Sequence, residues 1–245
     1  MANIQSLISK LNPNSKVVFF TGAGISAESG ISTFRDPDGY WSNYDPMKLA
    51  SQQGFSEDPE LVLSWYNARR ERIRTASPNA GHHCITDFQK LFQDSVVITQ
   101  NVDGLHAQAG NDPVFELHGN IFMNKCNQCE KAFEMDKNSQ KTLQHCSCGG
   151  PIRPDVVWFG ESLDLQVLHN AFDKVRTCDI FFTIGTSTQI YPANQLPFEA
   201  QAAGAFTIEV NPESTPFSSE ANMSLQEPAG IALPKLYEDF YAQLS

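Results

Sequence analysis

Residues 17–27, VVFFTGAGISA, decide the fold of this chain. The first four are apolar without polar alternation, which is typical of a strand buried on both faces of a parallel sheet. GAGISA follows at once and satisfies the dinucleotide pattern G-x-G-x-x-G/A. Its glycines permit a tight turn that lets the backbone approach a pyrophosphate, and the helix that starts there offers free N–H groups. Taken alone, the hexamer is weak evidence, because a glycine turn before a packed helix has the same pattern.

Three further short apolar runs also end in polar or glycine-rich residues. They are 95–99 (SVVIT, then QNVD), 180–184 (IFFTI, then GTS) and 206–210 (FTIEV, then NP). Segments with helical character, 82–92 and 163–175, lie between them. The alternation predicts an α/β fold with a Rossmann-like, doubly wound parallel sheet. Strand ends need turn residues in any fold, but four polar ends together favour one shared ligand crevice.

Two stretches depart from this alternation and predict a smaller inserted lobe. Residues 36–78 contain no convincing strand and are expected to form a loop and then a helix over 60–74. Residues 124–151 are polar and hold four of the six cysteines. We therefore expect one domain over 1–245, with a large part formed by 1–35, 79–122 and 152–245 and a small lobe formed by 36–78 (helical) and 123–151. Residues 211–229 are expected to form a loop.

Composition and charge limit the classes of molecule that this chain is expected to bind. The 245 residues are 41% hydrophobic and 18% charged, which is ordinary for a globular protein, and the net charge of −11 argues against nucleic-acid binding. An acidic surface is compatible with basic partners such as lysine-rich protein segments. Lys10, Pro13 and Lys16 interrupt any apolar leader, and no run is long enough to span a membrane. We expect a cytoplasmic, monomeric protein whose cysteines serve metal or redox chemistry before disulfides.

The expected acidic strand end of a dehydrogenase is missing. In an ordinary dinucleotide site, a second strand ends in an acidic residue about twenty positions after the glycine turn. Here Asp36, Asp38 and Asp45 fall in a predicted loop instead. This excludes a plain dehydrogenase and suggests NAD bound in a different pose, with its nicotinamide end consumed.

Five motifs then point to one family. They are GAGISAESGI at 22–31 followed by TFR at 33–35, TQNVDGLH at 99–106, ELHGN at 116–120, RPDVVWFGE at 153–161 and GTS at 185–187. In order and spacing they resemble the sirtuins, over nearly the whole chain, and the compact length resembles bacterial members. The resemblance implies a Rossmann-like domain, a zinc-bearing lobe, and NAD and acyl-lysine meeting between them. The acyl oxygen would attack the ribose carbon as nicotinamide leaves, giving free lysine, nicotinamide and O-acyl-ADP-ribose.

The resemblance also implies the catalytic residues. His118 would act as general base on a ribose hydroxyl, because imidazole titrates near neutral pH. An isolated histidine is more often structural, so this role depends on the flanking motif. Asn101 and Asp103 would hold the nicotinamide ribose and carboxamide. His106 would support the loop and not act as base.

The implied cofactor site is formed by Gly22, Ala23, Gly24, Ile25, Ser26, Glu28, Phe34, Arg35, Tyr40, Trp41, Gln100, Asn101, Val102, Asp103, Gly185, Thr186, Ser187, Asn211 and Ala229. Among these, Arg35 and Ser26 would address phosphates and order the loop. Ser187 and Asn211 would hold the adenosine half. For the substrate, the backbone of Val157 would pair with the peptide, and Phe159 would line the acyl-lysine tunnel.

Four cysteines resemble a structural zinc site. They are Cys126, Cys129, Cys146 and Cys148. The second pair is separated by one residue where the family usually has two, so alignment on the following glycines places the expected ligand on His145. A Cys₃His site is therefore an alternative to the four-cysteine site, which we favour. Cys84 and Cys178 lack partners and are expected to be buried structural residues.

Tyr66 and Arg69 lie three residues apart, on one face of the predicted 60–74 helix. This Tyr-x-x-Arg resembles the signature of class III sirtuins, which accept malonyl, succinyl or glutaryl lysine. A guanidinium and a phenol would bind the acyl carboxylate, and acetyl-lysine should still fit. Because Arg70, Arg72 and Arg74 follow, the alternative is a solvated basic helix face.

Two other functions remain open from the sequence. One is a mono-ADP-ribosyltransferase that moves ADP-ribose to a protein side chain, against which the acyl pocket argues. The other is a non-catalytic sensor of NAD or acyl-lysine, against which the retention of His118, Asn101 and Asp103 argues.

Overall fold

The computed structural model describes residues 12–32, 45–134 and 143–244. The elements of the main part are β1 (Lys16–Thr21), α2 (Ala23–Ala27), α6 (Ala80–Leu91), β2 (Asp94–Thr99), α7 (Leu105–Ala109), β3 (Val114–Glu116), α8 (Leu165–Val175), β7 (Ile180–Ile184), the 3₁₀ turn η1 (Ala193–Gln195), α9 (Leu196–Ala202), β8 (Phe206–Val210), β9 (Met223–Leu225) and α10 (Ala229–Leu244). The four predicted strands are confirmed as β1, β2, β7 and β8, and the two predicted helices as α6 and α8.

Six parallel strands form the main sheet in the order β3-β2-β1-β7-β8-β9. The chain builds outward from β1 to β3 on one side, then restarts at β7 and builds to β9 on the other. This is the strand order of a doubly wound dinucleotide-binding fold, with the switch point between β1 and β7. The predicted Rossmann-like fold class is confirmed.

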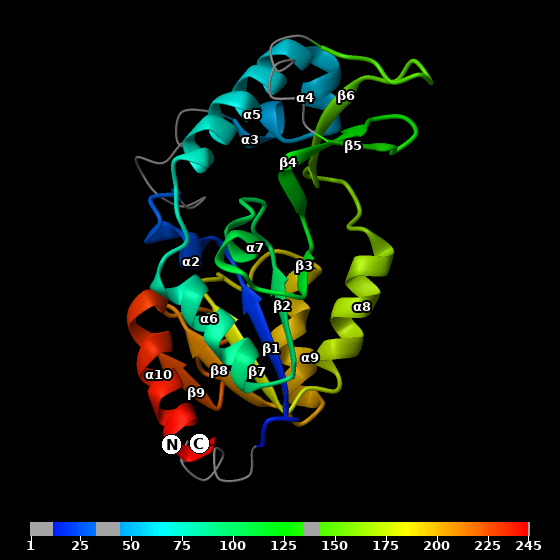
Figure 1. The fold of residues 1–245 in the computed structure, drawn as a ribbon. Helices are drawn as coiled ribbons and strands as arrows, with labels where there is room; N and C mark the ends of the chain where they lie inside the picture. The colour runs from blue at the N-terminus through cyan, green and yellow to red at the C-terminus, as the bar shows by residue number, and fades with distance from the viewer. Residues whose placement is uncertain (1–11, 33–44, 135–142, 245) are drawn as a thin grey trace.

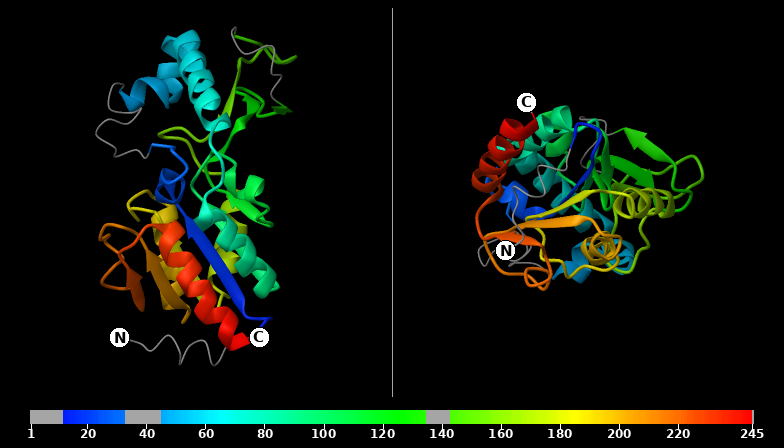
Figure 2. Two further views of the ribbon diagram at one scale, coloured as in Figure 1. Left: turned by 60° about the vertical axis from the view of Figure 1, so that its left-hand side comes forward. Right: turned by 90° about the horizontal axis from the view of Figure 1, so that it is seen from below.

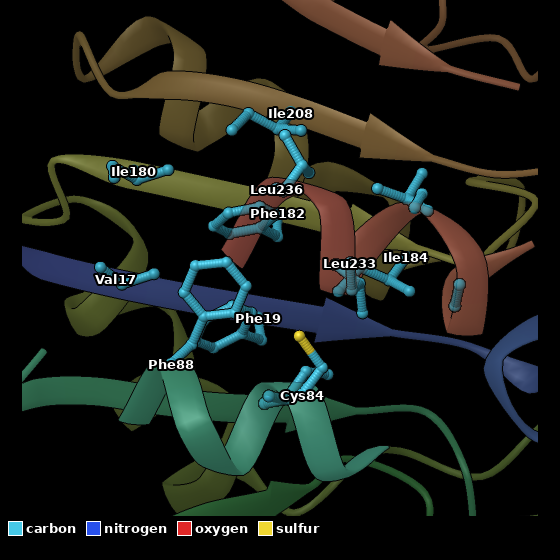
Figure 3. Close-up of a cluster of buried hydrophobic side chains, with 14 of the residues drawn as sticks. Val17, Phe19, Cys84, Phe88, Ile180, Phe182, Ile184, Ile208, Leu233 and Leu236 are labelled. Carbon is cyan, nitrogen blue, oxygen red and sulfur yellow. The ribbon is translucent and has the colours of Figure 1, made fainter. Parts of the chain in front are cut away.

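Helices cover both faces of this sheet, which explains why its strands read as unbroken apolar runs. Val17 and Phe19 of β1 pack with α6 and α10 on one face, where Phe88 of α6 meets the Phe19 ring (Figure 3). Val18 and Phe20 pack with α8 and α9 on the other face (Figures 1 and 2). Each fully buried phenylalanine contributes about 1.5–3 kcal/mol relative to an exposed one.

The small lobe gathers at one end of the main sheet (Figure 1). Its elements are α3 (Pro46–Leu49), α4 (Gln52–Glu57), α5 (Pro59–Arg74), β4 (Gly119–Cys126), β5 (Ala132–Glu134) and β6 (Ile152–Val156). The three strands form a separate sheet in the order β5-β4-β6. An apolar core that includes Val62, Trp65, Ile121 and Trp158 joins α5 to these strands. The predicted lobe boundaries stay a prediction.

Capping residues set where the helix of this lobe begins. The Asp58 side chain accepts a hydrogen bond from the Leu61 N–H at 2.9 Å, and Pro59 occupies the first helical position. Both features stabilise a helix start, because the first N–H groups lack partners within the helix. They explain why α5 begins at the proline named in the sequence.

Two expectations of irregular structure need correction. The predicted loop over 211–229 contains the short edge strand β9, which pairs with β8 alone and whose three residues carry no apolar run. The predicted loop before α5 contains α3 and α4, which are capped by Asp45 and Ser51. Short elements of this kind are fixed by capping and pairing, not by hydrophobic period. Across the part of the chain that the structure describes, no helix combines the length and apolar character needed to cross a membrane.

Candidate active site

The carboxyl ends of four strands lie level at one edge of the main sheet. Thr21 of β1 is in register with Thr99 of β2 and with Ile184 of β7, and Ile184 is in register with Val210 of β8. The predicted cofactor residues that follow these strands are therefore brought side by side. This edge faces the small lobe (Figure 1), as expected for a ligand crevice in this fold.

The turns after β1 and β7 touch through their backbones, and glycine is required at the contact. The Gly24 N–H donates to the Gly185 carbonyl at 2.8 Å. A Cβ on Gly24 would lie 2.7 Å from the Gly185 Cα, and a Cβ on Gly185 would lie 2.4 Å from the Ile25 nitrogen. Gly185 also has a φ of +58°, which disfavours other residues. The glycine pattern thus has a packing reason in addition to any phosphate contact.

Ser26, Asn101 and Asp103 form a buried polar cluster. The Ser26 hydroxyl donates to Asp103 Oδ2 at 2.7 Å, and Asn101 Nδ2 donates to Ser26 Oγ at 3.1 Å. Asn101 Nδ2 also donates to the Gly22 carbonyl at 3.0 Å, and Asp103 Oδ1 accepts from the Leu105 N–H at 2.9 Å. Side chains separated by more than seventy positions in the sequence are thus locked together.

A second set of hydrogen bonds connects β2, β7 and β8. Gln100 Nε2 donates to Thr186 Oγ1 at 2.7 Å, and Asn211 Nδ2 donates to the Thr186 carbonyl at 2.9 Å. Ser187 is half-buried beside them. Just before Asn211, the buried Glu209 carboxylate accepts hydrogen bonds from the hydroxyls of Thr215, Ser218 and Ser224. The loop that follows β8 is therefore held in one arrangement.

The other predicted cofactor residues differ in how far their side chains are buried and in what they contact. Ile25 and Val102 are buried, so a ligand at this edge would meet their backbones. Glu28 Oε2 accepts a hydrogen bond from the Gly230 N–H at 2.8 Å, next to Ala229, and so joins α2 to α10. Phe34, Arg35, Tyr40 and Trp41 lie outside the described residues.

His118 is poised as a neutral imidazole. Its Nδ1 lies 2.9 Å from the Gln100 carbonyl, which can only accept, so Nδ1 carries the proton and Nε2 keeps a lone pair. Burial lowers the pKa of His118 below its ordinary 6.5, although the bond to Gln100 raises it. At pH 7 the residue is therefore a neutral base whose Nε2 carries no proton.

His106 is occupied on both nitrogens. Its Nε2 lies 2.9 Å from Thr21 Oγ1, and its Nδ1 lies 2.6 Å from Asn111 Oδ1. The residue is 2% exposed, and burial lowers its pKa. With no free nitrogen, His106 braces the loop after β2 and is unsuited to proton transfer with a ligand.

Tyr66 and Arg69 lie one turn apart on α5, in the small lobe. Tyr66 is 1% exposed, and its hydroxyl accepts a hydrogen bond from Trp158 Nε1 at 2.9 Å. Burial raises the pKa of Tyr66 to about 12, while the nearby charge of Arg69 lowers it. Arg69 is half-buried, with its guanidinium carbon 5.5 Å from the centroid of the Trp65 ring. The two side chains are thus close enough to interact electrostatically.

Arg70, the next residue, has a different place. It is 3% exposed and donates to the Ile121 carbonyl at 2.5 Å and to Asn124 Oδ1 at 2.7 Å. It also donates to the Met123 carbonyl at 3.3 Å. Arg70 therefore fastens α5 to β4, and the alternative of a solvated basic helix face is wrong for this residue.

The segment after β6 carries the predicted peptide-binding residues. The Val157 N–H donates to the His118 carbonyl at 3.0 Å, so a substrate peptide would have to pair with the Val157 carbonyl. The Phe159 N–H donates to the Ala50 carbonyl at 2.8 Å, and the Phe159 side chain is 44% exposed. The segment thus connects the catalytic histidine candidate with the small lobe.

Sequence reasoning missed a linked set behind this segment. Arg153 Nη2 lies 2.5 Å from Glu161 Oε1, and Glu161 Oε2 accepts from the Trp158 N–H at 2.8 Å. The Arg153 guanidinium carbon lies 4.0 Å from the centroid of the Trp158 ring. All three residues stand in the motif RPDVVWFGE, which was the available signal, although their contacts with one another could not be read from it.

The four cysteine sulfurs lie within 4.8 Å of one another, as the predicted metal site requires. Two of the pairs, Cys126–Cys148 and Cys129–Cys146, have Sγ–Sγ distances of 3.5 and 3.7 Å. A tetrahedral Zn²⁺ with Zn–S bonds of about 2.3 Å places its sulfurs about 3.8 Å apart, so the cluster fits zinc. Exposed His145 is not part of this cluster in the described chain.

The two remaining cysteines are buried, as predicted. Cys84 and Cys178 are 6% and 7% exposed, and burial raises the pKa of each thiol to about 12. Both are therefore protonated and act as small apolar residues.

Comparison with known proteins agrees with this geometry. The model of the Sir2 family matches residues 22–192. An "NAD-dependent protein deacylase" of Aquifex aeolicus is 45% identical over 227 residues, covering 92% of this chain and 95% of that protein. The chain therefore belongs to the Sir2 family, as the motifs predicted.

Solved structures give the same result. A crystal structure of a Sir2 homologue in complex with NAD is 38% identical, with a TM-score of 0.89, and the match covers 100% of this chain and 96% of that one. A complex of Sir2 with a p53 peptide and NAD⁺ is 29% identical, with a TM-score of 0.80 and 99% coverage of both chains.

Proposed function

We propose that this chain is an NAD-dependent protein-lysine deacylase that accepts acidic acyl groups, such as succinyl and malonyl, as well as acetyl. Its products are the free lysine, nicotinamide and O-acyl-ADP-ribose. Family membership, together with relatives named NAD-dependent protein deacylase at 45% and 47% identity, supports the reaction class. The observation that supports the acyl specificity is the pairing of Tyr66 and Arg69, which lie one turn apart on α5 and close enough for the Arg69 charge to lower the pKa of Tyr66.

The level strand ends support the NAD site. Backbone groups of the 22–25 turn and of Gly185 approach one another there, and Gln100, Thr186 and Asn211 connect neighbouring turns. Such a preformed edge suits the two phosphates and the adenosine, while Asn101 and Asp103, which Ser26 holds by hydrogen bonds, suit the nicotinamide ribose and carboxamide. NAD supplies the electrophilic ribose carbon and the leaving nicotinamide.

His118 would then take a proton from a ribose hydroxyl. Its Nε2 has the free lone pair, and its Nδ1 is fixed by the Gln100 carbonyl, which also belongs to the proposed cofactor site. One backbone contact thus couples the orientation of the base to the position of the cofactor. General-base catalysis of this kind contributes roughly 10²–10⁴-fold to a rate.

In the proposed acyl pocket, two different hydrogen-bond donors bind the carboxylate of the acyl group. Arg69 supplies a permanent positive charge, and the high pKa of Tyr66 keeps its phenol protonated and able to donate. A carboxylate at the end of a succinyl group can accept from both, through charge-assisted hydrogen bonds. An acetyl group forms neither bond, so it should bind more weakly without being excluded.

The zinc lobe has a structural part in this proposal. Cys126, Cys129, Cys146 and Cys148 would hold one Zn²⁺, which contributes folding free energy and no reaction step. By fastening the end of β4 to the turn that precedes β6, the metal site would keep the segment that carries Val157 and Phe159 in place. Acyl-lysine segments of other proteins are the proposed partners; monomeric state and cytoplasmic location stay predictions.

Mass spectrometry of matched acetyl-lysine and succinyl-lysine peptides, incubated with and without NAD, tests the proposal. NAD-dependent loss of the succinyl group, with O-succinyl-ADP-ribose appearing, is the expected result. Loss of acetyl alone would retain the reaction and reject the acidic pocket. A peptide that gains the mass of ADP-ribose instead would favour the transferase, and an unchanged peptide with bound NAD would favour a sensor.

A further inference from the structure

Trp158 makes a contact that the proposed reaction has not used. Its indole is 2% exposed, and its Nε1–H donates to the Tyr66 hydroxyl oxygen at 2.9 Å. The two residues stand 92 positions apart: Tyr66 lies in α5 of the helical insertion, and Trp158 follows β6. A tryptophan N–H can only donate, so the direction of this hydrogen bond is certain from the chemistry of the two groups.

This contact decides what the Tyr66 hydroxyl can do. A phenol oxygen both accepts and donates, and here one acceptor position is already filled by Trp158. Burial keeps the phenol protonated, with a pKa of about 12. Its proton therefore points away from the Trp158 N–H, in a direction from which it can be donated to another acceptor such as a carboxylate.

Trp158 is itself held from several sides. The guanidinium of Arg153 lies over its ring, and the ring of Phe55 packs against it with centroids 5.2 Å apart. The Glu161 carboxylate accepts a hydrogen bond from the backbone N–H of Trp158 and forms an ion pair with Arg153. The indole is thus fixed, which makes the direction of its side-chain N–H a built feature and not an average over rotamers.

We infer that Trp158 is a positioning residue for acyl selectivity, which orients the Tyr66 hydroxyl so that its proton is directed at the terminal carboxylate of an acidic acyl group. This inference rests on the proposed acidic-acyl pocket. It adds that the selectivity depends on a donor which need not touch the substrate, located in the segment between Val157 and Phe159. The same segment, residues 157–159, would then position both the bound peptide and the side chain that recognises the acyl group.

Two substitutions separate the N–H from the packing of the indole. Trp158→Phe keeps an aromatic ring for Arg153 and Phe55 but removes the donor. Trp158→His keeps a ring N–H at a similar distance from the backbone but loses most of the packing surface. The measured quantity is the ratio of kcat/KM for a succinyl-lysine peptide to that for the matched acetyl-lysine peptide, with melting temperature measured in parallel.

We expect Trp158→Phe to lower this ratio about fivefold, mainly through a higher KM for the succinyl peptide, as loss of one oriented hydrogen bond implies. Trp158→His should restore part of the ratio although it melts lower. In a Tyr66→Phe background, Trp158→Phe should change the ratio by less than about twofold, because the hydroxyl it orients is gone.

Other outcomes overturn the inference in distinguishable ways. A ratio that follows melting temperature, with Trp158→His worse than Trp158→Phe, would make Trp158 a packing residue only. Equal effects of Trp158→Phe with and without the Tyr66 hydroxyl would lead to the same conclusion. If Tyr66→Phe and Arg69→Met leave the ratio unchanged, the acidic-acyl pocket itself fails, and the role of Trp158 fails with it.

Discussion

The main sheet and the small lobe are stabilised by different interactions. Around β1 the sheet buries phenylalanine and branched aliphatic side chains on both faces, with few polar groups among them. The small lobe has a smaller apolar core and adds two buried arginines, Arg70 and Arg153, and the cysteine cluster. A core of the first kind supports a rigid ligand edge. The stability of the small-lobe core depends on a few individual side chains, so the two regions should respond differently to substitution.

The largest effect should come from the sheet side. His118→Ala removes the proposed base and is expected to lower kcat for acetyl and succinyl peptides alike by at least about a hundredfold. NAD binding, measured by calorimetry, should persist, because the strand-end turns are untouched. His169→Ala on exposed α8 is the matched control. Retained turnover in His118→Ala would remove this residue from its role.

On the small-lobe side, the next largest effect should follow loss of zinc. Cys129→Ser is expected to abolish bound zinc, measured by elemental analysis, and to unfold the lobe, because structural zinc sites contribute on the order of 10 kcal/mol. Cys178→Ala, a buried cysteine outside the cluster, should retain the metal. Zinc lost from His145→Ala but retained in Cys146→Ala would instead establish the Cys₃His alternative.

Arg70 should affect stability without changing selectivity. Arg70→Met removes the donor to the buried Ile121 carbonyl and to the half-buried Asn124 side chain and is expected to lower the free energy of unfolding by about 2–3 kcal/mol. Activity toward both acyl groups should fall together, since α5 as a whole loosens. Urea denaturation measures the first effect. A selective loss of succinyl activity would mean that Arg70, and not only Arg69, serves the pocket.

The smallest effect concerns pH. The reaction needs neutral His118, and burial lowers its pKa below 6.5, so activity should be lost only as pH falls below that value. Over the pH range in which His118 loses its proton, log kcat/KM is expected to rise with pH and to level off before pH 7. A midpoint above 6.5 would indicate that an anionic neighbour, and not burial, dominates this site.

The sequence predicted the sheet better than the lobe, for physical reasons. Strands β1, β2, β7 and β8 are buried on both faces, so their apolar runs report burial directly, and the motifs after them fix the ligand edge. Edge strand β9 has no such signal. Pairs such as Trp158 with Tyr66 depend on how α5 packs against the segment after β6, which no local pattern records.

The neighbours Arg69 and Arg70 show this limit most clearly. They have the same chemistry and adjacent positions, and only the rotation of α5 against β4 decides which is buried. The motif Tyr-x-x-Arg indicated Arg69, while the run of arginines argued for a solvated face. The structure places Arg70 in the lobe core and leaves Arg69 half-buried near Tyr66.

The most direct test of the central claim is the acyl selectivity of wild-type protein and Arg69→Met. The ratio of kcat/KM for succinyl over acetyl peptides should fall by roughly 10–100-fold in the variant, because a charged hydrogen-bond donor to the carboxylate is lost. Arg72→Met, on the same helix, is the matched control. An unchanged ratio, or equal losses for both peptides, would contradict the acidic-acyl pocket and return Arg69 to a structural part.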